Sequence, residues 1–232
     1  MKIDGRVAGA VVFWLTRPLR GRLGLSHVYH YDLRRPVTPF RADIRVEICR
    51  ATMSDVEEAA LLQAPRDPER FNGWLDNGNA CFVAKADGRV VAFNWTWFSS
   101  GSDGGCTVVL GPGEIYTTNA FTAPGYRGRK IHTETLAYML HAAKVEGYRD
   151  AYTMVSVLNR ASRKTMDRLG WRLSGRVVRL RIRRSASFVV LAFSGSRRPL
   201  GGPAFGVQHA LEHLFRPAGR AARRRRRSPP AL

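Results

Sequence analysis

The alternation of hydrophobic and polar residues becomes regular from Asp43 and predicts a series of short strands and helices. From Ile44 the predicted order is β-α-α-β-β-β-α-β-α-β-β, with hairpins early and crossovers late. This order predicts a mixed α/β fold, and no internal repeat is visible. The predicted strands lie in 44–51, 80–100 (a hairpin), 113–124, 151–157, 171–184 and 187–195, and the predicted helices follow Ser54, occupy 67–78 and 160–170, and begin near Ile131.

Local signals define the ends of several of these elements. Ser54, with Glu57 three residues later, matches the reciprocal capping pattern and predicts the start of a helix. Asp87-Gly88 is a favoured pair for a tight turn and predicts the hairpin. The glycine-rich segment Gly101–Gly105 predicts a flexible loop.

Large apolar side chains recur at every second position of the second hairpin strand, at Val91, Phe93, Trp95 and Trp97. Because side chains alternate between the two faces of a strand, this spacing predicts that all four share one face. Core packing is the first interpretation of that face, and a wall beside a substrate is the alternative.

The composition favours a folded, metal-free protein. The chain has 232 residues, of which 44% are hydrophobic and 10% aromatic, enough to bury a sizeable core. Cys49, Cys81 and Cys106 are far apart in or near strand-like runs, which predicts reduced, structural thiols and a cytoplasmic location. Neither the cysteines nor the histidines show the spacing of metal ligands.

The charge is strongly positive and uneven. The formal net charge is +20, but only five of the 38 basic residues are lysine, a bias that a GC-rich coding sequence would produce. Residues 197–232 hold nine arginines against one acidic residue and end in the run Arg223–Arg227. Such a run repels itself, so we expect a largely disordered basic tail, either solvated or in weak contact with an anionic membrane or nucleic acid.

The N-terminal run Val7–Leu15 is apolar and has basic neighbours. It is too short to span a bilayer, which needs about twenty residues. Asp4 and the lack of a convincing cleavage site argue against a signal peptide. We expect a packed or surface-lying segment, with at most a peripheral association with a membrane.

Candidate chemistry begins in the stretch AFTAPGYRGRKIHTETL, residues 120–136. A basic turn containing Arg127, Gly128, Arg129 and Lys130 leads directly into the helix predicted to begin near Ile131. The N-terminus of a helix offers unpaired N–H groups and the positive end of the helix dipole. This turn therefore predicts a phosphate or pyrophosphate site, with a merely exposed basic turn as the alternative.

A second motif strengthens the first. Asn159 and Ser162 open the next predicted helix, which Leu169-Gly170-Trp171 closes. Together with the segment 122–132, TAPGYRGRKIH, this pair of motifs resembles the GNAT superfamily of acyl-CoA-dependent N-acyltransferases over about residues 43–184. The resemblance implies a central, mostly antiparallel mixed sheet flanked by helices, and acetyl-CoA or another acyl-CoA as co-substrate.

The resemblance also implies the residues that bind acyl-CoA. Backbone groups near the end of the predicted strand 113–124 would pair with the pantetheine arm, and the basic turn after that strand would hold the pyrophosphate. The start of the predicted helix 160–170 would contact the other side of the arm. The expected cofactor-binding residues are Phe121, Thr122, Arg127, Gly128, Arg129, Lys130, Ile131, His132, Asn159 and Ser162.

The chain departs from the family pattern at three positions. Lys130 and His132 replace glycines, and we expect Lys130 to keep a right-handed helical backbone and to offer its ammonium to a phosphate. His132 could reach the phosphates, the substrate mouth or only the surface. Met166 replaces a tyrosine that protonates the leaving thiolate in many relatives, so that role is vacant or has moved.

The expected proton acceptor lies on the strand before the turn. Acyl transfer requires a neutral amine, so a carboxylate or a water held by one commonly removes its proton. Glu114 is the candidate base, with Tyr116 on the same face of the strand as the second candidate. A surface role at the strand end is the alternative for Glu114.

These features predict three regions: an N-terminal extension (1–42) with a short helix and strand packed on the core, a GNAT-like acyltransferase domain (43–196) and the basic tail (197–232). The predicted acceptor is an unidentified amine, which could be a small molecule, an amino sugar or a protein amino group. The alternative is a catalytically degenerate member that binds nucleic acid or anionic membrane.

Overall fold

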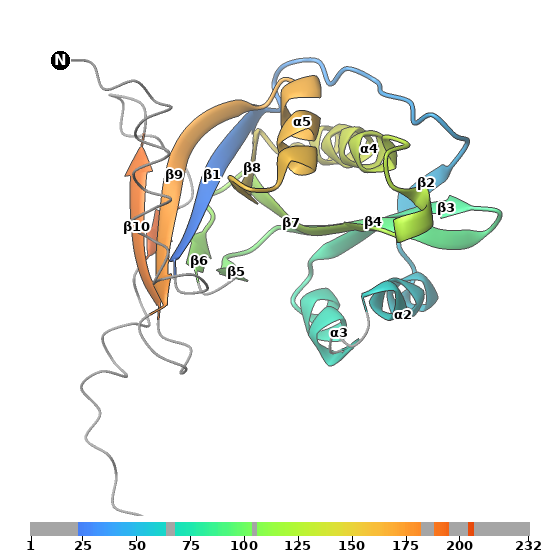
Figure 1. Ribbon diagram of the computed structural model, residues 1–232, viewed down its shortest axis with the longest axis horizontal. Coiled ribbons are helices and arrows are strands. Elements are labelled where there is room, and N and C mark those ends of the chain that lie inside the picture. Colours follow the sequence, from blue (N-terminus) through green and yellow to red (C-terminus); the bar gives the residue numbers. More distant parts are fainter. Residues whose placement is uncertain (1–22, 64–67, 104–105, 182–187, 195–203, 207–232) are drawn as a thin grey trace, which may run out of the picture.

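The computed structural model describes residues 23–63, 68–103, 106–181, 188–194 and 204–206 (Figure 1). The apolar run Val7–Leu15 and most of the predicted basic tail lie outside the described residues. Within the described part of the chain, no helix has the length and apolar character needed to cross a membrane.

An eight-stranded sheet runs through the molecule in the order β10-β9-β1-β8-β7-β4-β3-β2. All neighbouring strands are antiparallel except β7 and β8, which are parallel, so the expected mostly antiparallel mixed sheet is confirmed. Its strands are β1 (Leu23–Asp32), β2 (Glu47–Arg50), β3 (Ala80–Ala86), β4 (Arg89–Trp97), β7 (Glu114–Thr122), β8 (Asp150–Ser156), β9 (Arg172–Arg181) and β10 (Phe188–Ser194).

Helices cover both faces of this sheet (Figure 1). Helices α2 (Met53–Leu62) and α3 (Pro68–Asp76) lie on one face, and α4 (Ile131–Val145) and α5 (Arg160–Arg168) on the other. A short 3-10 helix, η2 (Pro124–Tyr126), joins β7 to α4. The predicted order of strands and helices from Ile44 is therefore correct, apart from a small inserted sheet.

That small sheet corrects the expected loop at Gly101–Gly105. Residues Gly101–Asp103 form β5, which pairs with β6 (Cys106–Val109), and β6 pairs in turn with β11 (Ala204–Gly206). The glycines predicted a loop because glycine is a frequent loop residue, and β11, which completes this sheet, lies far along the chain from β6. Part of the segment assigned to the basic tail is thus a strand.

The capping residue of α2 also differs from the prediction. The N-cap is Thr52 rather than Ser54: the Thr52 hydroxyl accepts a hydrogen bond from the N–H of Asp55, whose carboxylate accepts one from the N–H of Thr52. Burial alone would raise the pKa of Asp55, but hydrogen bonds from Lys85 and Thr52 lower it. Lys85 on β3 pairs with Asp55 at 2.8 Å and ties the start of the helix to the sheet.

The hairpin turn matches its prediction, but the strand after it is irregular. Asp87 and Gly88 have φ values of 50° and 76°, as a tight hairpin turn requires. The pairing of β3 with β4 shifts at Val91, which has no partner in the register. As a result Val91 packs in a different cluster from Phe93 and Trp95, so the predicted common face is wrong at that residue.

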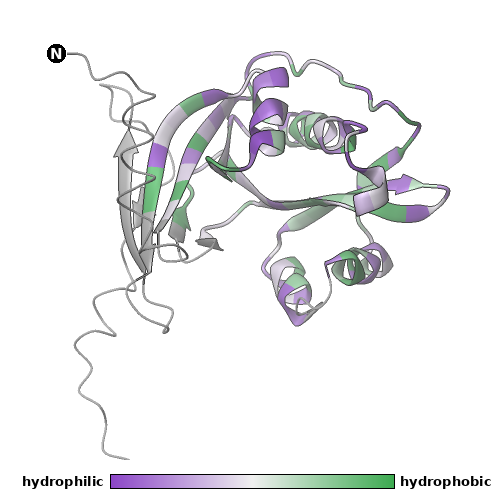
Figure 2. Cartoon of the chain, in the orientation of Figure 1, coloured by the Kyte–Doolittle hydropathy of each residue, from purple (hydrophilic) through white to green (hydrophobic). Residues whose placement is uncertain are grey.

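Two apolar clusters hold the layers together. Phe93 and Trp95 are buried against Phe71 of α3 and Val56 of α2, so core packing is the correct interpretation for these two rings. On the opposite face, a larger cluster joins α4 to β1, β7 and β8. In contrast, α5 is a largely hydrophilic helix (Figure 2).

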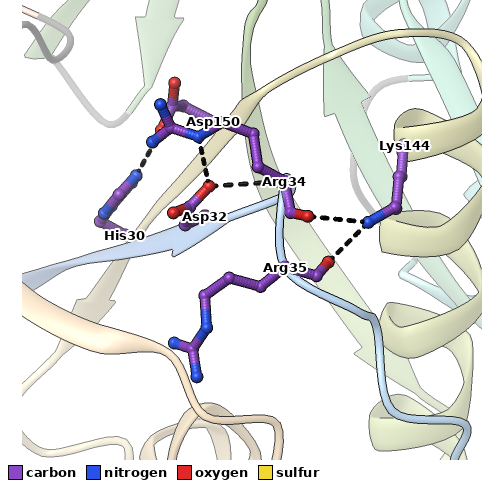
Figure 3. A network of polar contacts seen from close by, with 6 residues as sticks. All are labelled: His30, Asp32, Arg34, Arg35, Lys144 and Asp150. Atoms are coloured by element: carbon purple, nitrogen blue, oxygen red, sulfur yellow. Dashed lines mark hydrogen bonds and ion pairs between the residues drawn. The ribbon is translucent and has the colours of Figure 1, made fainter.

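Strand β1 lies inside the sheet, between β8 and β9, although the sequence assigns it to an N-terminal extension. A polar network fixes its end (Figure 3). His30 contacts Asp150 of β8 at 2.7 Å, and Arg34 contacts Asp32 at 2.7 Å and Asp150 at 3.7 Å. Lys144, near the end of α4, donates to the carbonyl of Arg34 and to that of the next residue. The network therefore joins β1, β8 and α4.

Candidate active site

Strands β7 and β8 separate halfway along their length. They pair only between Glu114–Thr117 and Asp150–Thr153, and beyond this point β7 pairs with β4 alone. A cavity of about 200 Å³ lies at this divergence, which we call the splay cavity. It is lined by Asn94, Thr117, Thr118, Asn119, Ala120, His132, Leu136, Thr153, Met154, Val155, Ser156, Asn159, Ser162 and Met166.

The turn between β7 and α4 has two residues in the left-handed region. Gly128 has φ 81°, which glycine adopts without strain. Lys130, the N-cap of α4, has φ 59° and ψ 15°. The expected right-handed backbone at Lys130 is therefore wrong: this lysine takes the left-handed conformation that glycine adopts easily.

The left-handed turn leaves a set of N–H groups pointing away from protein acceptors. The first helical bonds of α4 run from Thr133 and Glu134 to the carbonyl of Lys130. Among the described residues, the backbone N–H groups of Gly128 through His132 have no hydrogen-bond partner. Successive free N–H groups at a helix N-terminus can bind an anion.

A second cavity, of about 560 Å³, opens in front of these N–H groups, and we call it the cradle cavity. All of the expected cofactor-binding residues except Arg129 line it. The Arg129 guanidinium instead lies 5.9 Å from the ring centre of Tyr126. Because Ala120, His132, Asn159 and Ser162 line both cavities, the cradle cavity and the splay cavity are adjacent.

The basic side chains of the turn are partly engaged within the protein. The Lys130 ammonium pairs with Asp43 at 2.6 Å, so it is not a free charge for a phosphate as the sequence suggested. Arg127 donates through Nε to the carbonyl of Thr122 at 3.1 Å and lies 5.5 Å from the ring centre of Phe121. The rest of the Arg127 guanidinium fork can still donate to an anion.

His132 lies at the junction of the two cavities and is half-buried. Desolvation lowers its pKa to about 4. The imidazole is therefore neutral near pH 7, where it can take part in hydrogen bonds but adds no positive charge.

Asn159 and Ser162 lie at the start of α5 and line both cavities. The Asn159 side-chain carbonyl accepts a hydrogen bond from the N–H of Ser162 at 3.0 Å, which caps the helix. Thr165 and Thr133 contact each other through their hydroxyls at 3.3 Å and connect α5 to α4. Met166 is buried and lines the splay cavity, and its thioether cannot donate a proton.

Two basic residues of the cradle cavity were missed by the sequence reasoning. Lys164 and Arg168 on α5 line the cavity opposite the start of α4. The signal was their spacing of four, which places both on one face of a helix. A charged face on a hydrophilic helix is usually solvated, so the spacing alone did not distinguish Lys164 and Arg168 from ordinary solvent-exposed residues.

The two candidate proton acceptors lie away from these cavities. Glu114 is at the beginning of β7, and its carboxylate accepts a hydrogen bond from the N–H of Gly111 at 2.8 Å. Tyr116 is fully buried, with its ring centre 5.5 Å from that of Trp97. Burial raises the pKa of Tyr152, and the neighbouring Glu114 carboxylate raises it further.

No group of three or more potential metal ligands occurs within the described residues. Cys49 and Cys81 carry free thiols, and burial raises the pKa of both. Cys81 is buried under α2 in the core, and the side chain of Cys106 lies outside the described part.

The chain matches a known protein family and is similar to solved structures. The model of the acetyltransferase (GNAT) family matches residues 46–171. A GCN5-related N-acetyltransferase from Sphaerobacter thermophilus superposes with a TM-score of 0.50 at 15% identity, covering 80% of this chain and 56% of that one. A GNAT-family acetyltransferase structure from Novosphingobium aromaticivorans gives 0.49 at 17% identity, covering 75% and 66%.

The chain thus spans about two thirds or less of the length of these two structures. The aminoglycoside N-acetyltransferase AAC(6')-Iy, solved in complex with CoA, gives a TM-score of 0.45 at 20% identity, covering 54% of this chain and 91% of that one. No curated protein matches the sequence.

Proposed function

The chain belongs to the GNAT acetyltransferase family, and from that premise we propose that it transfers an acetyl or other acyl group from CoA to an amine. The acceptor would be a small amine, an amino sugar or a protein amino group. The observation that supports this proposal most directly is that the cradle cavity and the splay cavity are adjacent and share four lining residues. Together they could take a ligand with a phosphate-bearing end and a long, thin, hydrogen-bonding arm.

The cradle cavity would hold the pyrophosphate of acyl-CoA. The free N–H groups of residues 128–132 and the positive end of the α4 dipole would face its oxygens. Arg127, Lys164 and Arg168 would add positive charge around the rim. Because His132 is neutral and Lys130 is paired with Asp43, neither contributes a full free charge in this proposal.

The splay cavity would hold the pantetheine arm. Backbone groups near Phe121 and Thr122, which line the adjacent cradle cavity, lack pairing with β8, so they could pair with the amides of the arm where it leaves the splay cavity. Asn159 and Ser162 would lie along its other side. The acyl group would then sit beside Thr117 and Thr153, where the pairing of the two strands ends. Catalysis would depend mainly on positioning the amine against the thioester.

The proton acceptor is proposed to come from the first part of β7. Glu114, or Tyr116 acting through a water, would take the proton of the amine. Tyr116 directly precedes Thr117, which lines the splay cavity. Glu114→Gln should lower the transfer rate by about 10²–10⁴ without changing acyl-CoA affinity, and Tyr116→Phe is the matched variant. Wild-type rates in both variants would place the base elsewhere.

CoA binding itself can be tested with a pair of glycine variants. Acetyl-CoA at a hundredfold its Kd should stabilise the protein by about 2.7 kcal/mol. Gly128→Val forces a β-branched residue into φ 81° and should abolish this stabilisation. Gly125→Val adds the same atoms where the φ is not positive and nothing lies within 4 Å, so it should bind as the wild type does. Equal CoA affinity in both variants would contradict the proposed cradle.

The alternative of a nucleic-acid- or membrane-binding module is not favoured, because the family match covers residues 46–171 and both cavities. The run Arg223–Arg227 on which that alternative depends lies outside the described residues. A cytoplasmic location remains part of the proposal, as expected from the cysteines.

A further inference from the structure

A further cavity lies beside the segment that joins β1 to β2. This segment runs past α4 before it reaches β2, the strand at one edge of the sheet (Figure 1). Between the segment, β2 and α4 is a cavity of about 380 Å³, which we call the connector cavity. Among the described residues, it shares no lining residue with the cradle cavity or the splay cavity. A ligand held here would therefore be separate from the proposed acyl-CoA site.

The walls of the connector cavity are mostly apolar. Phe40 of the joining segment, Ile48 of β2, and Ala137 and the exposed Tyr138 of α4 all line it. Its volume falls within the range of small-molecule sites, about 300–1,000 Å³. Apolar and aromatic walls of this extent suit the body of a small organic ligand.

A buried carboxylate lines this apolar space. Glu134, in the first turn of α4, has a side chain that is only 9% exposed. Its Oε2 accepts a hydrogen bond of 2.8 Å from the N–H of Ala42. Within the described part of the chain, the one partner of Oε1 is Nη1 of Arg41, at 3.2 Å. A carboxylate offers about four lone-pair sites, so Glu134 can accept further hydrogen bonds.

Arg41 is a weak partner for a buried charge. Its side chain is 90% exposed, so the pair is screened by water, and holding the arginine in one geometry costs side-chain entropy. A buried charge is costly unless it is well paired, because its desolvation is otherwise uncompensated. A ligand that brings a cationic N–H into the cavity can replace Arg41 at Oε1 and release the arginine to solvent.

The charges around the connector cavity select the sign of the ligand. A carboxylate ligand could pair with Arg41 but would lie beside the Glu134 carboxylate, and like charges in one site repel. A neutral apolar ligand would cover Glu134 without replacing the hydrogen bond from Arg41. His141, the third ionisable residue of the lining, is exposed to solvent. Charge complementarity with the buried carboxylate therefore favours an ammonium ion that carries an apolar group.

We propose that the connector cavity is a second ligand-binding site, which takes a small organic ammonium ion with an aromatic or aliphatic body. The ammonium donates to the Glu134 carboxylate, and the body packs against Phe40 and Ile48. The ligand is bound without being chemically changed. This inference is independent of the proposed acyl transfer.

Dimethylphenethylamine is the probe for this site, because this tertiary amine is cationic near pH 7 and cannot be acylated to a stable amide. In an NMR titration of the isotope-labelled full chain, the amide signals of Ala42 and Ala137 should shift, and those of Gly128 and Ser162 should not. Phenethyl alcohol and phenylpropionate carry the same ring with a neutral or an anionic end. Both should bind at least about tenfold more weakly than the ammonium.

Three variants test the role of the carboxylate. Glu134→Gln keeps an acceptor for the N–H of Ala42 but removes the charge, so it should weaken binding of the ammonium by about tenfold or more. Arg41→Gln removes the competing cation and should strengthen binding by about two- to fivefold. Glu146→Gln is the matched control, because Glu146, the C-cap of α4, also pairs with an arginine, Arg50 at 3.3 Å, but does not line the cavity. Its affinity for the ammonium should equal that of the wild type.

Equal affinities for the ammonium and the alcohol, or an unchanged ammonium affinity in Glu134→Gln, would overturn the proposal. Because the Arg41 side chain is almost fully exposed, Arg41→Gln keeps the test valid if Glu134→Gln folds poorly, and unchanged or weaker binding there would also overturn it. Shifts at Ala42 and Ala137 that follow protein concentration rather than the probe would mean that a second copy of the chain covers the cavity. That outcome would refute the ammonium site as well.

Discussion

Replacing Lys130 with glycine tests how the anion-binding turn is held. Lys130 is the N-cap of α4 with φ 59°, and its ammonium pairs with Asp43 at 2.6 Å. The N–H of Asp43 also donates to the carbonyl of Arg129 at 3.0 Å. We infer that the lysine tolerates a strained backbone because its side chain attaches the turn to the segment before β2.

The magnitudes can be separated with two substitutions. A left-handed conformation costs an L-residue about 1–2 kcal/mol, and glycine avoids that cost. Lys130→Ala and Lys130→Gly both remove the ion pair, so the difference between them isolates the backbone term. Glycine should therefore be more stable than alanine by about 1–2 kcal/mol, or about 2–8 °C in Tm for a chain of this size.

The ion pair between Lys130 and Asp43 contributes less to the free energy of unfolding than the backbone term does, because the two side chains are 40% and 47% exposed. It should contribute about 0.2–1 kcal/mol, measured as the loss in Asp43→Asn. In the Lys130→Gly background Asp43→Asn should cost nothing, which a double-mutant cycle would show. Urea denaturation monitored by Trp fluorescence gives all four free energies of unfolding.

Two results would refute this reasoning. Equal stability of the glycine and alanine variants would mean that the turn is not left-handed at Lys130 in solution. A large loss of CoA affinity in Lys130→Gly, with a gain in Asp43→Asn, would mean that the ammonium leaves Asp43 to bind phosphate. We expect CoA affinity to stay unchanged in both.

Arg168→Gln and Lys164→Gln should each weaken CoA binding by about three- to tenfold at low salt and reduce its salt dependence, whereas Arg160→Gln, on the same helix but outside the cradle cavity, should not. Asp55→Asn should lower stability near pH 7 by about 1–2 kcal/mol and flatten the pH dependence in acid. The folded pKa of Asp55 lies below its ordinary value of 3.8, so the stability it provides is present above that value and is lost as the pH falls through it toward the folded pKa. Chemical denaturation at pH 7 and pH 3 checks this, and an equal pH dependence in wild type and variant would contradict it.

The sequence was sufficient to predict the elements whose signals are local. Helix α4 after a basic turn, the capped start of α5 at Asn159, and the Asp87-Gly88 hairpin all depend on neighbouring residues, and all are found. The residues expected around one cavity also come together, because they lie at the ends of consecutive strands and helices.

The failures have a common physical cause, which is a partner distant in sequence. Lys130 looked compatible with a right-handed turn, but Asp43 supports it from 87 residues away. The third strand of the small sheet, β11, also lies far along the chain from its partner β6. The positions of Lys164 and Arg168 in the cradle cavity depend on how α5 lies relative to α4, which their own segment does not encode.

The place of β1 in the sheet has a consequence for how the chain folds as it is synthesised. This strand leaves the ribosome before the other described strands, yet its partners are β8 and β9, with Leu23 opposite Leu180. At about 5–20 residues per second, β1 waits on the order of ten seconds for both of its edges to be covered. Such long-range pairing slows folding and leaves an exposed edge open to mispairing. The sheet can therefore close only late in synthesis, after the residues of both cavities have already been translated.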